Sequence, residues 1–309
     1  MTDAFAFPRR PLGKTGLEVT TLCVGAAPLA SMVDTFAYAV SEEQALATIR
    51  AVFASPINFI DTAASYGDGE SERRLGLALS KMGGVPEGYV LATKADRDLH
   101  TGKFDADQVL RSTERSLRLL GMKQVPLLYL HDPEHITYEE SMAPGGAVEG
   151  MVRCQREGLA AHIGVAGGPI DMMTRYVETG LFEVAISHNR YTLLSREADP
   201  FWDVCQRYGV AAVNAAPYGS GILAKGPAAY PRYRYSEAAP EIVERASQMA
   251  AICARYEVPL AAAALQFSLR DPRIASTIVG ISRPERLAET IELAHSPIPD
   301  ELWSALAAV

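Results

Sequence analysis

Three strand-like segments of this sequence each end in a polar side chain that can take part in proton transfer. The segment INFID ends at Asp61, YVLATK ends at Lys94 and VPLLYLH ends at His131, while Tyr66 follows Asp61 in a polar loop. A carboxylate at the end of a buried strand is costly unless it is paired, so we expect a cation beside Asp61. Lys94, at the end of the next strand-like segment, is the candidate for that cation.

These four residue types fit acid–base chemistry at one tyrosine. With its ordinary pKa of ~10, a tyrosine hydroxyl is a slow acid and a poor base at neutral pH. An ammonium group about 4 Å away contributes ~4 kcal/mol at an effective dielectric constant of ~20, which corresponds to roughly three pKa units. We therefore expect Asp61 to keep Lys94 charged and Lys94 to lower the pKa of Tyr66. His131 would orient the reacting oxygen, and a bound cofactor must carry the hydride, because no side chain can do so.

Each of these residues alone has an ordinary explanation. Strands of α/β proteins emerge from the core at their ends, so a single Asp or Lys there is commonly solvated or caps a helix. A single histidine is commonly a hydrogen-bonded residue at the rim. The set is harder to explain in this way, because all strands of a parallel barrel end at one face, where these side chains would meet.

The rest of the chain alternates between apolar strand-like segments and amphipathic helical segments. We expect eight strands, over residues 22–26, 57–61, 89–94, 125–131, 162–166, 183–187, 210–215 and 277–279. We expect helices over residues 42–55, 70–79, 105–120, 146–157, 170–179, 200–208, 240–256, 260–269 and 284–294. This alternation predicts a closed, parallel (β/α)8 TIM barrel covered by helices. No change of composition divides the chain, so residues 1–309 are expected to form a single domain.

Composition excludes several classes of protein. The chain has 309 residues, of which 48% are hydrophobic, and this fits one large α/β domain. Its net charge of −8 argues against nucleic-acid binding. No apolar segment approaches the ~18 residues of a membrane span, and MTDAFAFPRR lacks a signal-peptide core, so we expect a cytoplasmic protein without membrane contact. The dispersed cysteines predict reduced, mostly buried thiols: Cys23, Cys154, Cys205 and Cys253.

The motifs in this order resemble those of the aldo-keto reductases, over residues 12–295. DTAxxYG followed by Glu-Ser-Glu, a strand that ends in TK and a strand that ends in LH are similar to the family's catalytic tetrad. The resemblance implies that Asp61, Tyr66, Lys94 and His131 are catalytic. It also implies that the hairpin expected at 12–19 plugs the bottom of the barrel, and that NAD or NADP lies extended over its mouth without a Rossmann unit.

The resemblance also implies a set of coenzyme contacts. These are His188, Tyr218, Gly219, Gly221, Leu223, Gly280, Ser282, Arg286, Glu289 and Thr290. The segment GISRPERLAET at 280–290 is a loop that enters a helix, and helix N-termini bind phosphate groups. The alternative is an ordinary helix, with Ser282 as its N-cap and Glu285 three residues on.

Some positions depart from the wider family. Gly164 to Gly167 read GVAG where many members have Gly-x-Ser-Asn, His188 replaces a usual Gln, and Ala215 stands where many have a stacking ring. Gly280 stands where members that select NADP carry Lys, so we expect NAD to be accepted at least as well as NADP. NRYTLL at 189–194 and NAAPYGSGIL at 214–223 resemble the aldose, galactose and fucose dehydrogenase branch, which oxidises C1 of sugars.

Several functions remain open at this point. The first is NAD(P)-dependent oxidation of C1 of a fucose-, galactose- or arabinose-type sugar to the lactone, in a monomer or weak homo-oligomer. The second is reduction of aldehydes or ketones, and a pyridoxal-type hemiacetal is a related substrate. A metal hydrolase could use the ligands of HDPEH (His131, Asp132, Glu134 and His135), but no HxH ends the first strand, so no metal is expected. The fourth is a regulatory subunit without activity.

Two long loops could hold a ligand. They cover residues 28–40 and 218–239, and the second contains Tyr218, Tyr230, Tyr233 and Tyr235. The second loop either covers a ligand or is pinned to the surface by its tyrosines. Sugar recognition needs many polar partners, and the candidates are Ser31, Asp34, Thr35, Tyr38, His135, Asn189, Tyr218 and Ser220.

Overall fold

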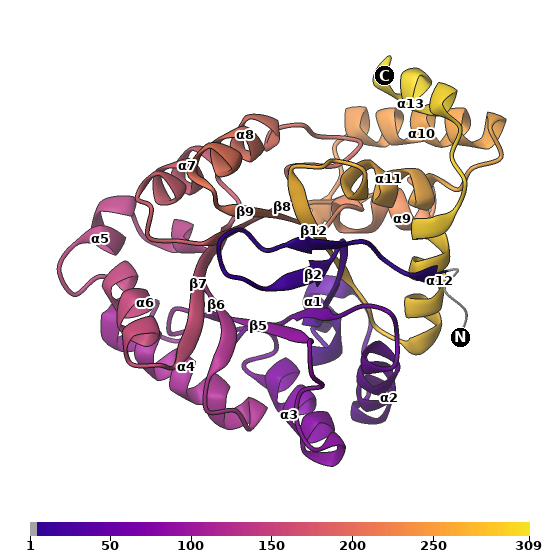
Figure 1. Ribbon diagram of the computed structural model, residues 1–309. Helices are drawn as coiled ribbons and strands as arrows, with labels where there is room; N and C mark the ends of the chain where they lie inside the picture. Colours follow the sequence, from indigo (N-terminus) through magenta and orange to yellow (C-terminus); the bar gives the residue numbers. More distant parts are fainter. Residues whose placement is uncertain (1–4) are drawn as a thin grey trace.

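A closed barrel of eight parallel strands forms the centre of the computed structural model, which describes residues 5–309 (Figure 1). Residues 1–4 of the N-terminal stretch considered above lie outside the described residues. In spatial order the strands are β12 (Ile274–Gly280), β3 (Leu22–Gly25), β4 (Phe59–Asp61), β5 (Val90–Ala95), β6 (Val125–His131), β7 (Ala160–Gly167), β8 (Val184–His188) and β9 (Ala211–Ala215). The predicted (β/α)8 fold is confirmed.

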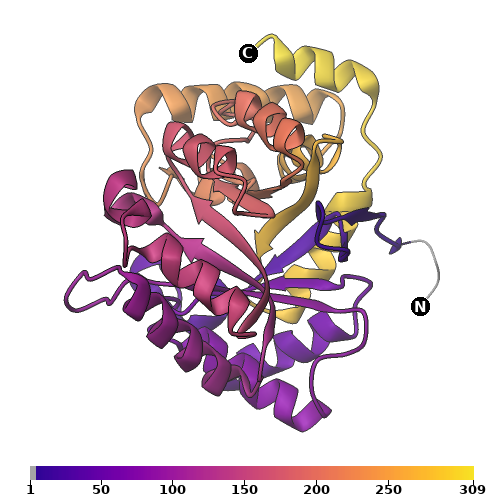
Figure 2. The same ribbon diagram turned by 60° about the vertical axis from the view of Figure 1, so that its left-hand side comes forward.

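Helices surround the barrel on its outside (Figures 1 and 2). They are α2 (Glu42–Phe53), α3 (Glu70–Met82), α4 (Ala106–Leu120), α5 (Tyr138–Met142), α6 (Ala147–Arg156), α7 (Ile170–Glu178), α8 (Asp199–Tyr208), α10 (Pro240–Arg255), α11 (Leu260–Leu269), α12 (Pro284–His295) and α13 (Asp300–Ala307). Ser41 caps α2, because its side chain accepts a hydrogen bond from Gln44 N. The helix α13, which packs against α10, was not predicted.

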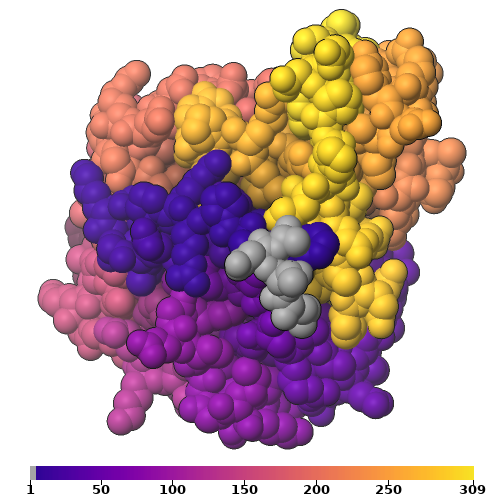
Figure 3. All heavy atoms as spheres, turned by 45° about the vertical axis from the view of Figure 1, so that its right-hand side comes forward, coloured from indigo at the N-terminus to yellow at the C-terminus, as the bar shows by residue number. Residues whose placement is uncertain are grey.

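A β-hairpin closes the amino-terminal face of the barrel, as predicted. Its strands β1 (Arg9–Pro11) and β2 (Glu18–Thr20) pair in antiparallel fashion, and Leu12 is fully buried. At Gly13, with φ of 62°, a Cβ atom would lie 3.0 Å from both Ala211 N and Glu183 O. Only glycine therefore fits so close to the ends of β8 and β9. In Figure 3 the indigo N-terminal residues lie at the surface on the left, with the yellow C-terminal residues to their right and purple residues below.

The pleat of the strands sends alternate side chains into the barrel. In β4, Phe59 packs in the interior cluster and Ile60 packs toward the helices. In β6, Leu127 and Tyr129 belong to the interior cluster, whereas Leu128 packs outside. The next inward position at the carboxyl end of β4, β5 and β6 is Asp61, Lys94 and His131, respectively. Regular alternation thus brings three polar side chains to the mouth.

The two long loops contain short elements of their own. The loop after β3 forms η2 (Ala27–Ala30) and α1 (Val33–Phe36). The loop after β9 forms η4 (Gly219–Gly221), α9 (Ile222–Lys225), β10 (Arg232–Tyr233) and β11 (Ser236–Glu237). Two further short elements, η3 (Pro133–His135) and α5, follow β6.

Two other sequence-based expectations can be compared with the structure. The four cysteines are free and buried, as predicted. β12 begins at Ile274, three residues before the expected start, because its first residues pair with β9 across an irregularity between Ile274 and Ser276.

Among residues 5–309, no helix is both long and apolar enough to cross a membrane.

Candidate active site

Lys94 lies at the centre of a buried ion pair at the mouth of the barrel. Its Nζ donates hydrogen bonds to Asp61 Oδ1 at 2.5 Å, to Thr62 O at 2.8 Å and to Tyr66 Oη at 3.1 Å. An ammonium group has three donors, and these contacts use all of them. The side chains of Lys94 and Asp61 are each 3% exposed, so the pair is held away from water.

Burial and charge act in opposite directions on these groups. Burial acts to lower the pKa of Lys94, but Asp61 and Tyr66 outweigh it and raise the pKa above its ordinary value. Burial raises the pKa of Asp61, against the effect of Lys94. Lys94 is therefore charged at neutral pH, as expected from the sequence.

Tyr66 departs from the expectation for its hydroxyl. Burial raises the pKa of Tyr66 above its ordinary value, and Lys94 lowers it by less than burial raises it. The predicted net lowering is therefore wrong, although the predicted influence of Lys94 is present. The packing that brings the ammonium close also removes water from the hydroxyl. At neutral pH Tyr66 is a protonated, hydrogen-bonded phenol and can act as an acid.

His131 lies between two carboxylates. Its Nδ1 is 2.7 Å from Asp96 Oδ1, and its Nε2 is 3.8 Å from Asp132 Oδ2. Burial acts to lower the pKa of His131, but Asp96 and Asp132 raise it above its ordinary value. The ring lies edge-on to Tyr66, with 5.7 Å between the centroids.

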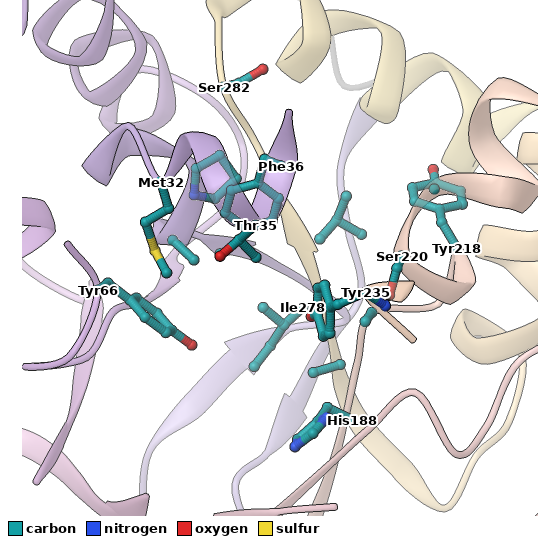
Figure 4. Close-up of a pocket in the computed structure, with 18 of the residues that line it drawn as sticks. Met32, Thr35, Phe36, Tyr66, His188, Tyr218, Ser220, Tyr235, Ile278 and Ser282 are labelled. Atoms are coloured by element: carbon teal, nitrogen blue, oxygen red, sulfur yellow. Dashed lines mark hydrogen bonds between the residues drawn. The ribbon is translucent and has the colours of Figure 1, made fainter. Parts of the chain in front are cut away.

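All four predicted catalytic residues line one cavity of about 830 Å³. This volume falls in the range of ~300–1,000 Å³ that is common for small-molecule sites. Figure 4 shows Tyr66 pointing its hydroxyl into the cavity, with Met32, Thr35 and Phe36 above it. Tyr218, Ser220 and Tyr235 approach from the other side, His188 lies at one end and Ser282 at the other (Figure 4).

Comparison with known proteins identifies the family. A sequence model described as the Aldo/keto reductase family matches residues 21–309, which include every strand of the barrel and all four residues at its mouth. The chain belongs to this family. Aldo/keto reductases are oxidoreductases that use NAD(P)(H).

This aldo/keto reductase is similar to characterised dehydrogenases along its length. It is 32% identical to D-threo-aldose 1-dehydrogenase of Pseudomonas sp, over 94% of each chain. It is 30% identical to pyridoxal 4-dehydrogenase of Microbacterium luteolum, over 97% of each chain. Its fold matches that of aldo-keto reductase AKR11C1 from Bacillus halodurans in the holo form, with a TM-score of 0.78 at 21% identity, over 98% of this chain and 96% of the other.

Most residues of the predicted coenzyme set line the cavity. These are His188, Tyr218, Gly221, Gly280, Ser282, Arg286 and Glu289. Gly219, Leu223 and Thr290 do not. A Cβ at Gly219 would meet the ring of Tyr233 at 2.9 Å, and Leu223 is fully buried in the core. The hydroxyl of Thr290 donates to Arg286 O one helical turn back.

Ser282 does not cap a helix, so the alternative considered for this segment is wrong. Helix α12 begins after Arg283, which occupies the N-cap position. The carbonyl of Ser282 accepts a hydrogen bond of 2.8 Å from Gln44 Nε2. Gln44 of α2 therefore holds the backbone of Ser282 at the wall of the cavity.

Positive charges gather at this end of the cavity. Lys225, Arg283 and Arg286 line it, and Lys225 was not identified from the sequence. Burial and the two arginines lower the pKa of Lys225. Arg286 pairs with Glu289 at 2.9 Å, and Lys225 Nζ lies 3.9 Å from the centre of the Tyr230 ring. Such a cluster can bind phosphate.

At the opposite end of the cavity, three side chains of types that can bind a cation lie close together. They are Asp132, Glu134 and His188, whose ligand atoms lie within 4.8 Å of one another. His188 Nε2 is 3.4 Å from Asp132 Oδ1. The hydrolase ligand set considered above is not assembled among residues 5–309: His131 bonds to Asp96, and His135 lies outside the cluster.

The positions at which the chain departs from the wider family lie beside Asp132, Glu134 and His188. Ala166, His188 and Ala215 line the cavity where the resemblance implied contacts to nicotinamide. A Cβ at Gly167 would lie 2.8 Å from Glu134 Oε2, so the Glu134 carboxylate fills space that a side chain would occupy. Backbone N–H of Gly168 donates to the other oxygen of Glu134 at 3.0 Å.

The long loops supply part of the predicted polar lining. Thr35, Tyr38, Tyr218 and Ser220 line the cavity, whereas Ser31, Asp34, His135 and Asn189 do not. Three of the four loop tyrosines, Tyr218, Tyr230 and Tyr235, also line it, so the loop after β9 covers the cavity. The Ser220 hydroxyl ties this cover together, since it accepts from Tyr235 N at 3.0 Å and bonds to Asn189.

Proposed function

We propose that this protein is an NAD(P)-dependent dehydrogenase that oxidises C1 of an aldose to the lactone. The observation that carries this proposal is the arrangement of Asp61, Lys94, Tyr66 and His131 around one cavity. The similarity to D-threo-aldose 1-dehydrogenase over nearly the full chain supports a sugar as the substrate.

Each of the four residues at the mouth has its own role in proton transfer. In its phenolate form, after it has lost its own proton to solvent, Tyr66 takes the proton of the anomeric hydroxyl, and the Lys94 ammonium at 3.1 Å stabilises this phenolate. Asp61 keeps Lys94 charged, and His131 binds the sugar oxygen from the other side. When bound, the coenzyme accepts the hydride from C1. Hydrolysis of the lactone then draws the reaction toward oxidation.

The positive side chains of the cavity are complementary to the phosphate groups of the coenzyme. Lys225, Arg283 and Arg286 can bind its phosphate groups, and Ser282 adds a polar contact. The sequence favoured NAD because Gly280 provides no second cation, but Lys225 provides one from the loop after β9. We therefore propose that NADP is bound at least as well as NAD. Separate dissociation constants for the two coenzymes test this directly.

The substrate end of the cavity is mixed in character. Met32 and Phe36 present apolar surface toward Tyr66, and Thr35 presents a hydroxyl (Figure 4). Asp132 and His188 lie beside His131 and can bind further hydroxyl groups. A sugar ring has both apolar C–H surface and several hydroxyls, so it can satisfy both kinds of wall. We propose an aldose of the fucose, galactose or arabinose type.

Reduction of aldehydes is the second candidate. Burial raises the pKa of Tyr66, and a protonated phenol suits donation of a proton to the oxygen of a carbonyl group that is being reduced. Pyridoxal, as its hemiacetal, is a third substrate type, supported by the similarity to pyridoxal 4-dehydrogenase.

A panel assay separates these candidates. Purified protein is given each sugar with NAD or NADP, pyridoxal with both coenzymes, and small aldehydes with NADH or NADPH. We expect kcat/KM to be highest for one of the sugars, with a lactone as the product. Efficient reduction of small aldehydes, without turnover of any sugar, would replace this proposal with the reductase.

A further inference from the structure

Asp96 is a buried carboxylate that the chemistry described so far does not use. It follows Lys94 by two residues, and its Oδ1 lies 2.7 Å from Nδ1 of His131. Its Oδ2 accepts a hydrogen bond of 2.8 Å from Ser65 N. Its backbone is fixed too, because its N–H donates to Ser112 Oγ at 3.0 Å and its carbonyl accepts from Gln108 Nε2 at 3.1 Å. Four contacts from three segments thus hold Asp96 in one position.

Asp96 also lines a second cavity. This cavity has a volume of about 440 Å³ and is lined by Ser65, Gln108 and Arg111 as well, and Ser65 also lines the first cavity. The Asp96 residue is only 7% exposed, and its two carboxylate oxygens bond to Ser65 N and to His131 Nδ1. The Asp96–His131 bond therefore joins the wall of the second cavity to the catalytic histidine.

We propose that Asp96 is a positioning residue for His131. It fixes the hydrogen on Nδ1 and favours the imidazolium form, so that Nε2 donates a hydrogen bond to the reacting oxygen. A carboxylate bonded to one ring nitrogen is known to set the tautomer and orientation of a catalytic histidine. Because Asp132 faces Nε2 at 3.8 Å, both nitrogens can carry hydrogen at the same time.

Other charges around the ring do not replace this contribution. The groups that face His131 come from five places around the mouth: Asp61 of β4, Tyr66 and Ser65 of the loop after β4, Lys94 of β5 with Asp96 directly after it, Asp132 directly after β6, and, through Asp132, His188 of β8. Lys94 opposes a second positive charge, and its own charge is shared with Asp61. Asp132 is farther away than Asp96, and its other oxygen faces His188. Asp96 makes the shortest bond to the ring within residues 5–309, since the Ser65 hydroxyl lies 3.4 Å from the same nitrogen.

The effect of Asp96 on catalysis rests on the proposed function, whereas its effect on the tautomer and charge of His131 does not. A neutral imidazole with its hydrogen on Nδ1 would offer only a lone pair at Nε2. An imidazolium offers a donor, which can stabilise negative charge on the substrate oxygen during proton transfer. Asp96 would thus act on the reaction through His131 without touching the substrate.

The test substitutes Asp96 by Asn and follows His131 by NMR. An Asn whose oxygen accepts from Ser65 N presents its NH2 group to Nδ1, which removes the hydrogen from that nitrogen. With 15N-labelled histidine, the signals of the six histidines are compared, and His131 is assigned by its absence in His131→Gln. We expect Asp96→Asn to lower the titration midpoint of His131 by ~1 pH unit or more, as for loss of an opposite charge. The control is Asp107→Asn, an exposed carboxylate in the first turn of α4 that faces Arg153, which should leave the midpoint unchanged.

Activity supplies the second readout. In Asp96→Asn a neutral His131 still donates from Nε2, but without the charge that strengthens the bond, so we expect kcat to fall by ~10-fold, the Kd of the coenzyme to stay unchanged and the acid limb of the pH–rate profile to move. Asp96→Ser, which leaves room for water, gives the same comparison if the Asn variant does not fold. An unchanged His131 midpoint and tautomer in a folded variant would overturn the inference, whatever substrate the protein uses. A shifted midpoint in a protein that turns over no sugar would support the inference and contradict only the proposed function.

Discussion

The ammonium of Lys94 donates a hydrogen bond of 3.1 Å to the hydroxyl of Tyr66. Both groups lie at the mouth of the barrel, and the lysine is pinned by Asp61 on its other side. Lys94 therefore stabilises the phenolate of Tyr66 without being free to move away. This relationship determines how loss of either side chain should affect the enzyme.

Replacement of Tyr66 by Phe should stop proton transfer and leave the fold intact. Only one hydroxyl is lost, at the edge of a cavity. We expect kcat to fall by ~100-fold or more, which is the usual contribution of a positioned acid or base. Fluorescence titration with NADH or NADPH should give an unchanged Kd. Tyr256→Phe, at an exposed tyrosine, is the matched control. Turnover close to that of the native protein would show that Tyr66 is not the proton-transfer group.

Replacement of Lys94 by Met should affect both activity and stability. Asp61 would remain as a buried carboxylate without its cation, which costs ~3–5 kcal/mol of unfolding free energy. Asp61→Asn combined with Lys94→Met should recover much of that loss, because it removes the unpaired charge.

The pH dependence of the Lys94→Met variant tests its role in tuning Tyr66. Burial already raises the pKa of Tyr66, and Lys94 is the group that opposes this. Without Lys94 the pKa should rise further, so any remaining oxidation should require higher pH than in the native protein. A pH–rate profile that stays in place would contradict this role.

Much of this arrangement could be predicted from the sequence. Strand period places Asp61, Lys94 and His131 on the inner face, and the parallel barrel brings them together. Asp96 follows Lys94 by two residues, so strand alternation already indicated that its side chain points inward. Its bond to His131, however, depends on the twist between β5 and β6. Lys225 lies in a long loop, and loop conformation is set by tertiary contacts such as those of Tyr230. The direction in which the pKa of Tyr66 shifts depends on how deeply the hydroxyl is buried, and the spacing of residues in the sequence does not predict this burial.

Glu72 should make the stability of the protein depend on pH. It is fully buried on α3, accepts a hydrogen bond of 2.5 Å from the hydroxyl of Thr93, and burial raises its pKa to about 7. The native state therefore favours the protonated form. As pH rises from the ordinary value of 4.5 toward 7, the unfolded chain loses the proton first and the free energy of unfolding falls by ~3 kcal/mol.

The substitution Glu72→Gln should remove this dependence. The amide still accepts the Thr93 hydrogen bond but does not titrate. We expect the Tm of the variant, relative to the native protein, to increase between pH 5 and pH 8. Glu87→Gln, at an exposed position, should show no such trend. A constant Tm difference over this range would mean that Glu72 is ionised in the folded protein without cost.

Replacement of Lys225 by Ala should weaken binding of NADP more than binding of NAD. Lys225 lines the cavity beside Arg283 and Arg286, and a charged hydrogen bond to phosphate is worth ~1.5–3 kcal/mol. We expect the Kd of NADP to rise by ~10-fold or more. Lys81→Ala, on the surface of α3, is the control. An equal loss for both coenzymes would place Lys225 at a phosphate that they share.

Transfer of deuterium from C1 of a sugar tests the central claim most directly. The protein is incubated with NAD or NADP and a C1-deuterated aldose of the fucose, galactose or arabinose type, and the coenzyme and sugar products are analysed by mass spectrometry. We predict one deuterium in each reduced coenzyme, an equal amount of lactone or its hydrolysis product, and loss of both products in Tyr66→Phe. Tight coenzyme binding without any reduced coenzyme from these sugars would contradict the account.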